Sequence, residues 1–184
     1  SDNDLNDFRQ LGPSKGAENI LPLYSNSIVI NEIVPQPATG STDEFIELYN
    51  FGETEVDLSG WQIDDIAVGG STPYTIPTGT IIASGGYIAF YNSIDHISLN
   101  DSGDSARLID PNGDQKDIVV YAEANRGQSY SKFVADFDWT LALTPGAKNI
   151  LQIEIVTPDI DQDVPVIDIL SARQTEAGET VSVT

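Results

Sequence analysis

The stretch from Ile28 to Ile63, IVINEIVPQPATGSTDEFIELYNFGETEVDLSGWQI, decides the fold that we expect for this chain. Two short runs rich in β-branched and aromatic residues, 28–34 and 44–50, are joined by a polar loop and followed by an acidic turn that leads to LSGW. Runs of this length and composition are typical of strands in a β-sandwich. The stretch holds no recognisable catalytic group, so it favours a binding or spacer module.

The second of these runs carries apolar side chains on both of its faces. Because side chains alternate along a strand, Ile46 and Leu48 share one face, while Phe45 and Tyr49 share the other with Glu47. A strand with apolar surface on both sides is typical of the middle of a sheet. We therefore expect this strand to be central.

Strand-like segments separated by turn residues recur along the rest of the chain. The expected set is 28–34, 44–50, 60–64, 74–76, 80–83, 87–92, 105–110, 116–122 and 129–133. Between the seventh and eighth of these segments, the sequence DPNGD places Asn112 and Gly113 at the positions of a tight hairpin turn that require positive φ. Glycine pairs at Gly69 and at Gly85 mark further turns. These short intervals predict an all-β fold, an antiparallel sandwich.

Composition narrows the function classes. With 8 Lys and Arg against 29 Asp and Glu, the formal net charge is 8 − 29 = −21, which repels phosphate backbones and excludes direct nucleic-acid binding by this segment. The acidic excess is typical of a solvated surface in a salty or extracellular setting, and it also attracts divalent cations. Cys is absent, so neither a disulfide nor a thiolate metal site can form. No apolar run reaches the length of a membrane span.

The 184 residues suffice for one domain with flanking pieces. Polar residues 1–24 are interpreted as a leader or as the tail of a preceding unit, because SKGAENI at 14–20 resembles TPGAKNI at 144–150. The sandwich is expected over 25–150. Residues 151–184 are expected to form an acidic linker and β-strands, interpreted either as partners for the sandwich or as the truncated start of a next domain, which would resemble an oligonucleotide-binding fold. We expect a longer parent protein.

The motifs INEI, EFIELYN, VDLSGWQI, a Gly-Gly before an aromatic strand, RLIDPNGD and TPGAKN follow one another from about residue 28 to residue 149. In this order and spacing they resemble the lamin tail domain family. The resemblance implies an immunoglobulin-like antiparallel β-sandwich with short flanking segments. The family pattern falls on Asn31, Glu32, Glu44, Glu47, Leu48, Asn50, Leu58, Gly60, Trp61, Gly113, Thr144, Pro145, Gly146 and Asn149.

These positions are interpreted as framework. Trp61 is expected in the core with one partner for its indole N–H, and Gly60 is expected to give the ring room. Glu32 and Glu47 lie inside strand runs, where a carboxylate is costly unless hydrogen-bonded. They are expected either to accept backbone N–H groups at a sheet corner or, as the alternative, to line a site. A paired-carboxylate hydrolase would need them to face each other across a cleft. The single histidine, His96, is expected in a surface loop.

One candidate metal site lies beyond the expected sandwich. Asp159, Asp161 and Asp163 alternate in TPDIDQDVPV, so in an extended linker they face one side. Hard oxygen ligands at that spacing could hold Ca²⁺ between two modules and stiffen the joint. Plain solvation of the linker is the alternative. No other cofactor is expected.

By its resemblance, the chain is expected to be a non-enzymatic binding, attachment or targeting module of a larger secreted or surface protein, with a role in cell adhesion. Its partner would be a protein or a surface polysaccharide, held by the loops 69–74 and 123–130 with Tyr74 and Tyr130 as contact residues. One alternative is an accessory domain of a secreted nuclease or phosphodiesterase whose catalytic domain is absent from this chain. Another is a filament-associated role like that of the nuclear lamins. The sequence sets neither the ligand nor the oligomeric state.

Overall fold

The computed structural model of the chain describes residues 22–40, 43–134 and 136–153, and it is nearly all β. The larger sheet has five antiparallel strands in the order β11-β10-β1-β2-β7. Its members are β1 (Ile28–Val34), β2 (Phe45–Asn50), β7 (Tyr87–Tyr91), β10 (Ser129–Lys132) and β11 (Phe137–Thr140). The expected central position of the second strand is confirmed, because β2 pairs with β1 on one side and with β7 on the other.

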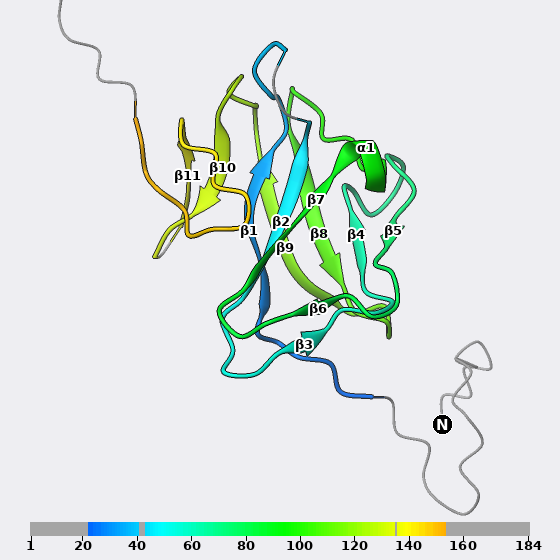
Figure 1. The fold of residues 1–184 in the computed structure, drawn as a ribbon. Coiled ribbons are helices and arrows are strands. Elements are labelled where there is room, and N and C mark those ends of the chain that lie inside the picture. The colour runs from blue at the N-terminus through cyan, green and yellow to red at the C-terminus, as the bar shows by residue number, and fades with distance from the viewer. Residues whose placement is uncertain (1–21, 41–42, 135, 154–184) are drawn as a thin grey trace, which may run out of the picture. The chain divides into compact units, whose positions relative to one another are not determined.

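A second, four-stranded sheet has the order β5-β4-β8-β9. It consists of β4 (Gln62–Asp64), β5 (Tyr74–Thr75), β8 (Asp104–Ile109) and β9 (Gln115–Tyr121), and the short strands β3 (Val56–Asp57) and β6 (Ile81–Ile82) form a separate ladder. Strand β1 contacts both β8 and β9 of this second sheet, and Figure 1 shows β1 and β2 in front of β8 and β9. The two sheets therefore pack face to face, and the expected immunoglobulin-like sandwich is confirmed.

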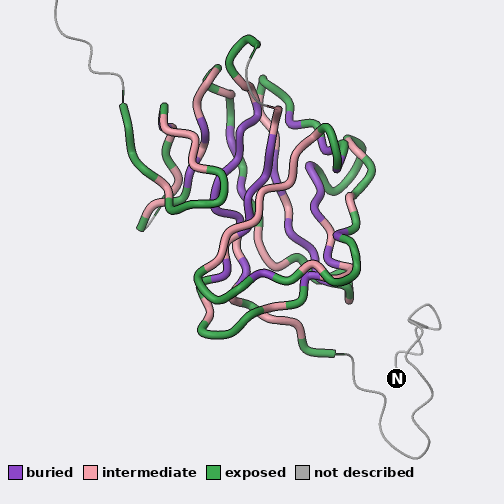
Figure 2. The backbone as a smooth tube through the Cα atoms, viewed as in Figure 1, coloured by how far each residue is buried: buried purple, intermediate pink, exposed green. Residues whose placement is uncertain are grey.

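The core lies between the two sheets, where buried residues concentrate along the strands (Figure 2). Trp61, just before β4, is fully buried and meets the ring of Tyr24 edge-on, with 6.0 Å between centroids. The expectation that its indole N–H finds a partner is wrong, because Nε1 is buried without a hydrogen bond within the described part of the chain.

The hairpin between β8 and β9 forms as expected, but with a different turn. The Gly113 N–H donates to the Asp110 carbonyl (2.8 Å), and the Asp110 N–H donates to the Asp114 carbonyl (2.9 Å). Gly113 has φ 86°, whereas Asn112 does not lie in the positive-φ region. The loop is thus a three-residue connection that closes on a left-handed glycine, so only one residue needs positive φ.

The sequence analysis did not predict three elements: β3, β11 and the short helix α1 (Asn92–Asp95). The last residue of the expected strand 87–92 is the first residue of this helix. Two or four residues are too few for a periodic signal. A Cβ at Gly60 would meet Pro111 at 3.7 Å, an ordinary van der Waals contact. Glycine is favoured at this position by its φ of 78°. Within the described residues, no helix has the length and apolarity needed to cross a membrane.

Candidate functional site

A β-bulge in β1 organises the outer face of the five-stranded sheet. The register of β1 against β2 shifts between Ile30, which pairs with Leu48, and Glu32, which pairs with Glu47. Asn31 is therefore the extra residue. Such a bulge re-aims the side chains around it, while Ile30 keeps its place in the core. As a result, three polar side chains, those of Asn31, Glu32 and Glu47, reach the segment 144–149 from one patch of the sheet.

The two carboxylates hold the segment 144–149 on the sheet. The Thr144 N–H donates to Glu32 Oε1 (3.0 Å) and the Thr144 hydroxyl donates to Glu32 Oε2 (3.0 Å). Glu47 accepts from the Gly146 N–H and from the Asn31 amide (2.8 Å). Both glutamates are fully buried. Their acceptor capacity is used by their own chain, so they do not face each other across an open cleft as a hydrolase pair would.

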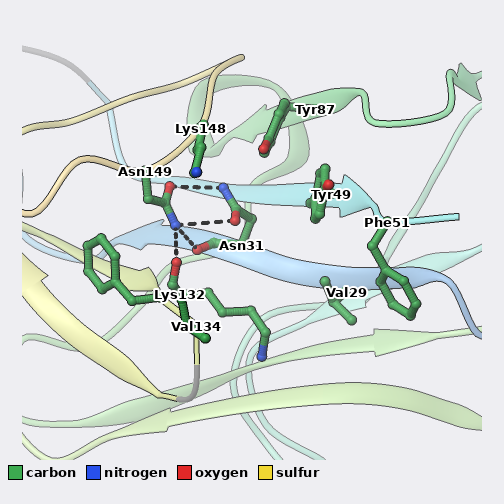
Figure 3. Close-up of a pocket in the computed structure, with 10 residues that line it drawn as sticks. Val29, Asn31, Tyr49, Phe51, Tyr87, Lys132, Val134, Lys148 and Asn149 are labelled. Carbon is green, nitrogen blue, oxygen red and sulfur yellow. Dashed lines mark hydrogen bonds between the residues drawn. The ribbon is translucent and has the colours of Figure 1, made fainter.

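Asn149 ends this segment and fixes it to two strands of the same sheet. Its Nδ2 group donates to the Asn31 carbonyl (2.9 Å) and to the Lys132 carbonyl at the end of β10 (2.8 Å). Its Oδ1 atom accepts from Asn31 Nδ2 (2.9 Å) and lies 3.2 Å from the Thr144 hydroxyl oxygen. Figure 3 shows the exchange between Asn31 and Asn149. The backbone next to Lys148 is therefore rigidly placed.

Burial also changes the acidity of one of the two anchors. Desolvation raises the pKa of Glu47 to about 7, and the nearby charge of Glu32 acts in the same direction. The donors from Gly146 and Asn31 favour the charged form and oppose the shift without cancelling it. Close to neutral pH, the Glu47 carboxyl therefore exchanges a proton while it holds the segment 144–149.

Beside this segment lies a pocket of about 460 Å³. Its walls are mostly apolar, with a few polar groups from β1 and from the ends of the segment (Figure 3). The lining residues are Val29, Asn31, Tyr49, Phe51, Tyr87, Lys132, Phe133, Val134, Lys148 and Asn149. A mostly apolar concavity with a few polar groups is the usual form of a ligand site.

Two tyrosines from neighbouring strands form one wall. Tyr49 of β2 pairs with Tyr87 of β7, and their rings are stacked with centroids 4.6 Å apart and an angle of 18° between planes. Burial raises the pKa of Tyr87, so its hydroxyl stays protonated and neutral under physiological conditions. Further along the chain, Phe51 is 56% exposed, an unusual exposure for so large an apolar ring.

Two lysines, Lys132 and Lys148, line this pocket, although the net charge of the chain is −21. Two other cations, outside the pocket, are already paired with acids. Arg107 is bound to Asp64 (2.6 Å) and Lys116 to Asp110 (3.1 Å). Lys132 places its ammonium 5.0 Å from the Phe137 ring centroid. The ammonium of Lys148 forms neither an ion pair nor a hydrogen bond with any residue that the structure describes. Of the two lysines that line the pocket, it is the one whose ammonium has no partner among the described residues.

The residues proposed from sequence lie elsewhere. Tyr74 is in β5 and packs against Phe90 (6.1 Å between centroids), while Tyr130 is in β10 and packs against Trp139 (4.9 Å). They belong to different sheets, and neither lines the 460 Å³ pocket. Sequence reasoning missed Tyr49, Tyr87 and Lys148, because their proximity depends on the pairing of β2 with β7 and on the distant segment 144–149. The only usable signal was the outward alternation of Tyr49.

The candidate calcium ligands Asp159, Asp161 and Asp163 lie outside the described residues. Among residues 22–40, 43–134 and 136–153, no group of three or more His, Cys, Asp or Glu is arranged to hold a metal ion. His96 is an exposed residue that ends α1 with φ 62°. It therefore lies at the protein surface and apart from the buried glutamates.

The two stacked antiparallel sheets define an immunoglobulin-like β-sandwich module, a class that is typically non-catalytic. The sequence model of the Lamin Tail Domain family matches residues 24–123, more than half of the 184 residues. The chain belongs to the lamin tail domain family. No curated protein matches it. The strands β10 and β11 follow the matched residues but complete the same sheet, and the segment 144–149 is bound to its outer face.

Proposed function

We propose that the chain is a non-catalytic binding and attachment module of a larger secreted or cell-surface protein, and that the 460 Å³ pocket holds its ligand. The observation that carries this proposal is the pocket itself. It combines the stacked Tyr49 and Tyr87, the exposed Phe51 and the unpaired Lys148 on the outer face of the five-stranded sheet. An exposed apolar ring and an unpaired cation in one pocket have no structural role that the described residues explain.

A binding role is supported over a catalytic one by the state of the carboxylates. Glu32 and Glu47 are the two fully buried acids next to the pocket, and both are bound to the backbone of the segment 144–149. General acid–base work needs a carboxyl group within reach of a substrate. These two are instead the anchors that shape one side of the pocket. An extracellular or surface location is consistent with the strongly acidic composition.

A pull-down of the surface fraction of the parent organism tests this proposal. The labelled chain is compared with the double variant Phe51→Ser/Lys148→Gln, which alters two exposed side chains of the pocket. The control is Val120→Ser/Arg126→Gln, which makes the same kinds of change at an exposed apolar residue and an exposed cation elsewhere. We expect the pocket variant to lose binding by at least tenfold and the control to retain it. Equal binding by both variants would refute the proposal.

A further inference from the structure

We infer that the ligand of this pocket is an oligosaccharide whose sugars carry a carboxylate, of the uronic-acid class. The inference rests on the proposed function and specifies the chemistry of its ligand. Three features of the pocket carry it: the aromatic and apolar walls, the two lysines that line it, of which Lys148 has no partner among the described residues, and the rigid backbone from which the Lys148 ammonium projects.

The walls suit the apolar faces of sugar rings. Tyr49, Tyr87 and Phe51 present aromatic surface, and Val29 adds an aliphatic contact. Aromatic side chains provide a large contact area together with, for tyrosine, a hydroxyl that can bond to a polar ligand. A volume of about 460 Å³ is within the range of small-molecule sites and accommodates one or two sugar rings. Figure 3 shows Lys148 next to Asn149, with Tyr87 and Tyr49 further along the pocket.

The polar end of the pocket favours an anion. The amide groups of Asn31 and Asn149 are largely engaged with each other and with the segment 144–149. Lys148 is exposed and unpaired, and a lysine ammonium offers three donors and no acceptor. A carboxylate is its best partner, because a hydrogen bond between two charged groups is about twice as strong as a neutral one. A neutral sugar would leave this charge without a partner.

The position of Lys148 is set before any ligand arrives. Its neighbour Asn149 bonds to the carbonyls of Asn31 and Lys132, and two residues earlier Gly146 is held by Glu47. Fixing the backbone on both sides reduces the entropy lost when a ligand binds. Arg126, an exposed cation in the turn before β10, differs from Lys148 in that it lines neither described pocket.

The net charge of the chain limits the form of the ligand. A charge of −21 repels a long polyanion, but at physiological ionic strength the repulsion is screened beyond about 8 Å. Within that distance, the charged residues that line the pocket are Lys132 and Lys148, and no acidic residue lines it. The ligand therefore engages the module through one or two acidic sugars and does not run across the surface as a continuous polyanion.

Calorimetric titration of the whole chain with uronic-acid trimers tests the inference. The probes are trimers of galacturonic and mannuronic acid, and each is matched by its methyl ester, which keeps the ring and removes the charge. We expect at least one acid trimer to bind and its ester to bind about tenfold more weakly. Lys148→Gln should weaken binding of the acid trimer about tenfold and abolish the preference over the ester, while Arg126→Gln changes neither. Equal affinity for acid and ester would overturn the inference.

The surface pull-down separates failure of this inference from failure of the proposed function. If no acid trimer binds, yet the surface fraction is still retained and Phe51→Ser/Lys148→Gln abolishes that retention, the ligand class is wrong and the pocket keeps its role. Loss of retention after protease treatment of the surface would identify a protein partner and would also overturn the inference. If the pocket variant retains the surface fraction normally, both proposals fail.

Discussion

Replacing Glu47 with Gln should remove a pH-dependent part of the stability of this sandwich. Glu47 is fully buried, and its pKa in the folded chain is about 7 against an ordinary value of 4.5. Between these values, the folded state binds more protons than the unfolded state. The stabilisation from this carboxyl is therefore complete below about pH 4.5 and is lost as pH rises through 7.

The size of the effect follows from the shift. A difference of 7 − 4.5 = 2.5 pKa units, at about 1.4 kcal/mol per unit, is worth roughly 3–4 kcal/mol, of which about 2–3 kcal/mol falls between pH 5 and pH 8. Gln is neutral at every pH in this range, so the variant lacks the pH-dependent contribution that Glu47 makes to the free energy of unfolding. It also turns an amide donor towards the Gly146 N–H or the Asn31 amide, at a cost of about 1–3 kcal/mol that does not vary with pH. The pH dependence is therefore the informative quantity.

Urea denaturation at pH 5, 6, 7 and 8 gives the free energy of unfolding for the wild type and for Glu47→Gln. The wild type should lose about 2–3 kcal/mol more than the variant over this range. Glu53→Gln is the control, since it makes the same chemical change at an exposed position. If the wild-type and Glu47→Gln curves run parallel, while the control behaves like the wild type, the assignment of a raised pKa to Glu47 is wrong.

Three further outcomes follow from the geometry. Asn149→Ala removes hydrogen bonds to two carbonyls and should lower the free energy of unfolding by about 2 kcal/mol. Amide hydrogen exchange should become faster at the residues that Asn149 holds. Unchanged exchange would contradict its anchoring role. Gly103→Ala places a Cβ 2.4 Å from the Ala122 carbonyl oxygen, at a residue with φ 109°. In thermal melts it should lower the melting temperature clearly more than Gly85→Ala, where φ is 67° and nothing lies within 4 Å of the added Cβ. Equal melting temperatures for the two variants would count against this packing. If the alternate aspartates of residues 159–163 bind Ca²⁺, millimolar Ca²⁺ should raise the melting temperature of the chain. Replacing all three aspartates with Asn should remove this rise. A wild-type melting temperature that does not change with Ca²⁺ would eliminate this site.

The strands were readable from the sequence because their signal is local. Alternation in residues 45–49 is enough to assign two faces to β2 and to predict its central position. Turn chemistry located the β8–β9 hairpin, although the choice between a two-residue and a three-residue loop depends on how the flanking strands pair. Strands of two residues, such as β3, are held by their ladder partner and leave no periodic pattern.

The candidate site was not readable, because its parts meet only through distant pairings. The bulge at Asn31 depends on the register of β1 against β2, which local sequence does not reveal. Glu32 and Glu47 were recognised as costly to bury, but their partners lie 112 and 99 residues further along the chain. The contact of Tyr49 with Tyr87 requires that β7 pair with β2 across the intervening β3 to β6.

The most direct test of the central claim is to map the ligand on the isotope-labelled chain by nuclear magnetic resonance. Titration with the acid trimer, or with solubilised surface polysaccharide, should shift the backbone amide signals of Tyr49, Tyr87 and Lys148 and leave those of Tyr74 and the loop 123–130 unchanged. Shifts confined to Tyr74 and that loop, with the pocket residues unaffected, would contradict the assignment of the binding site to the outer face of the five-stranded sheet.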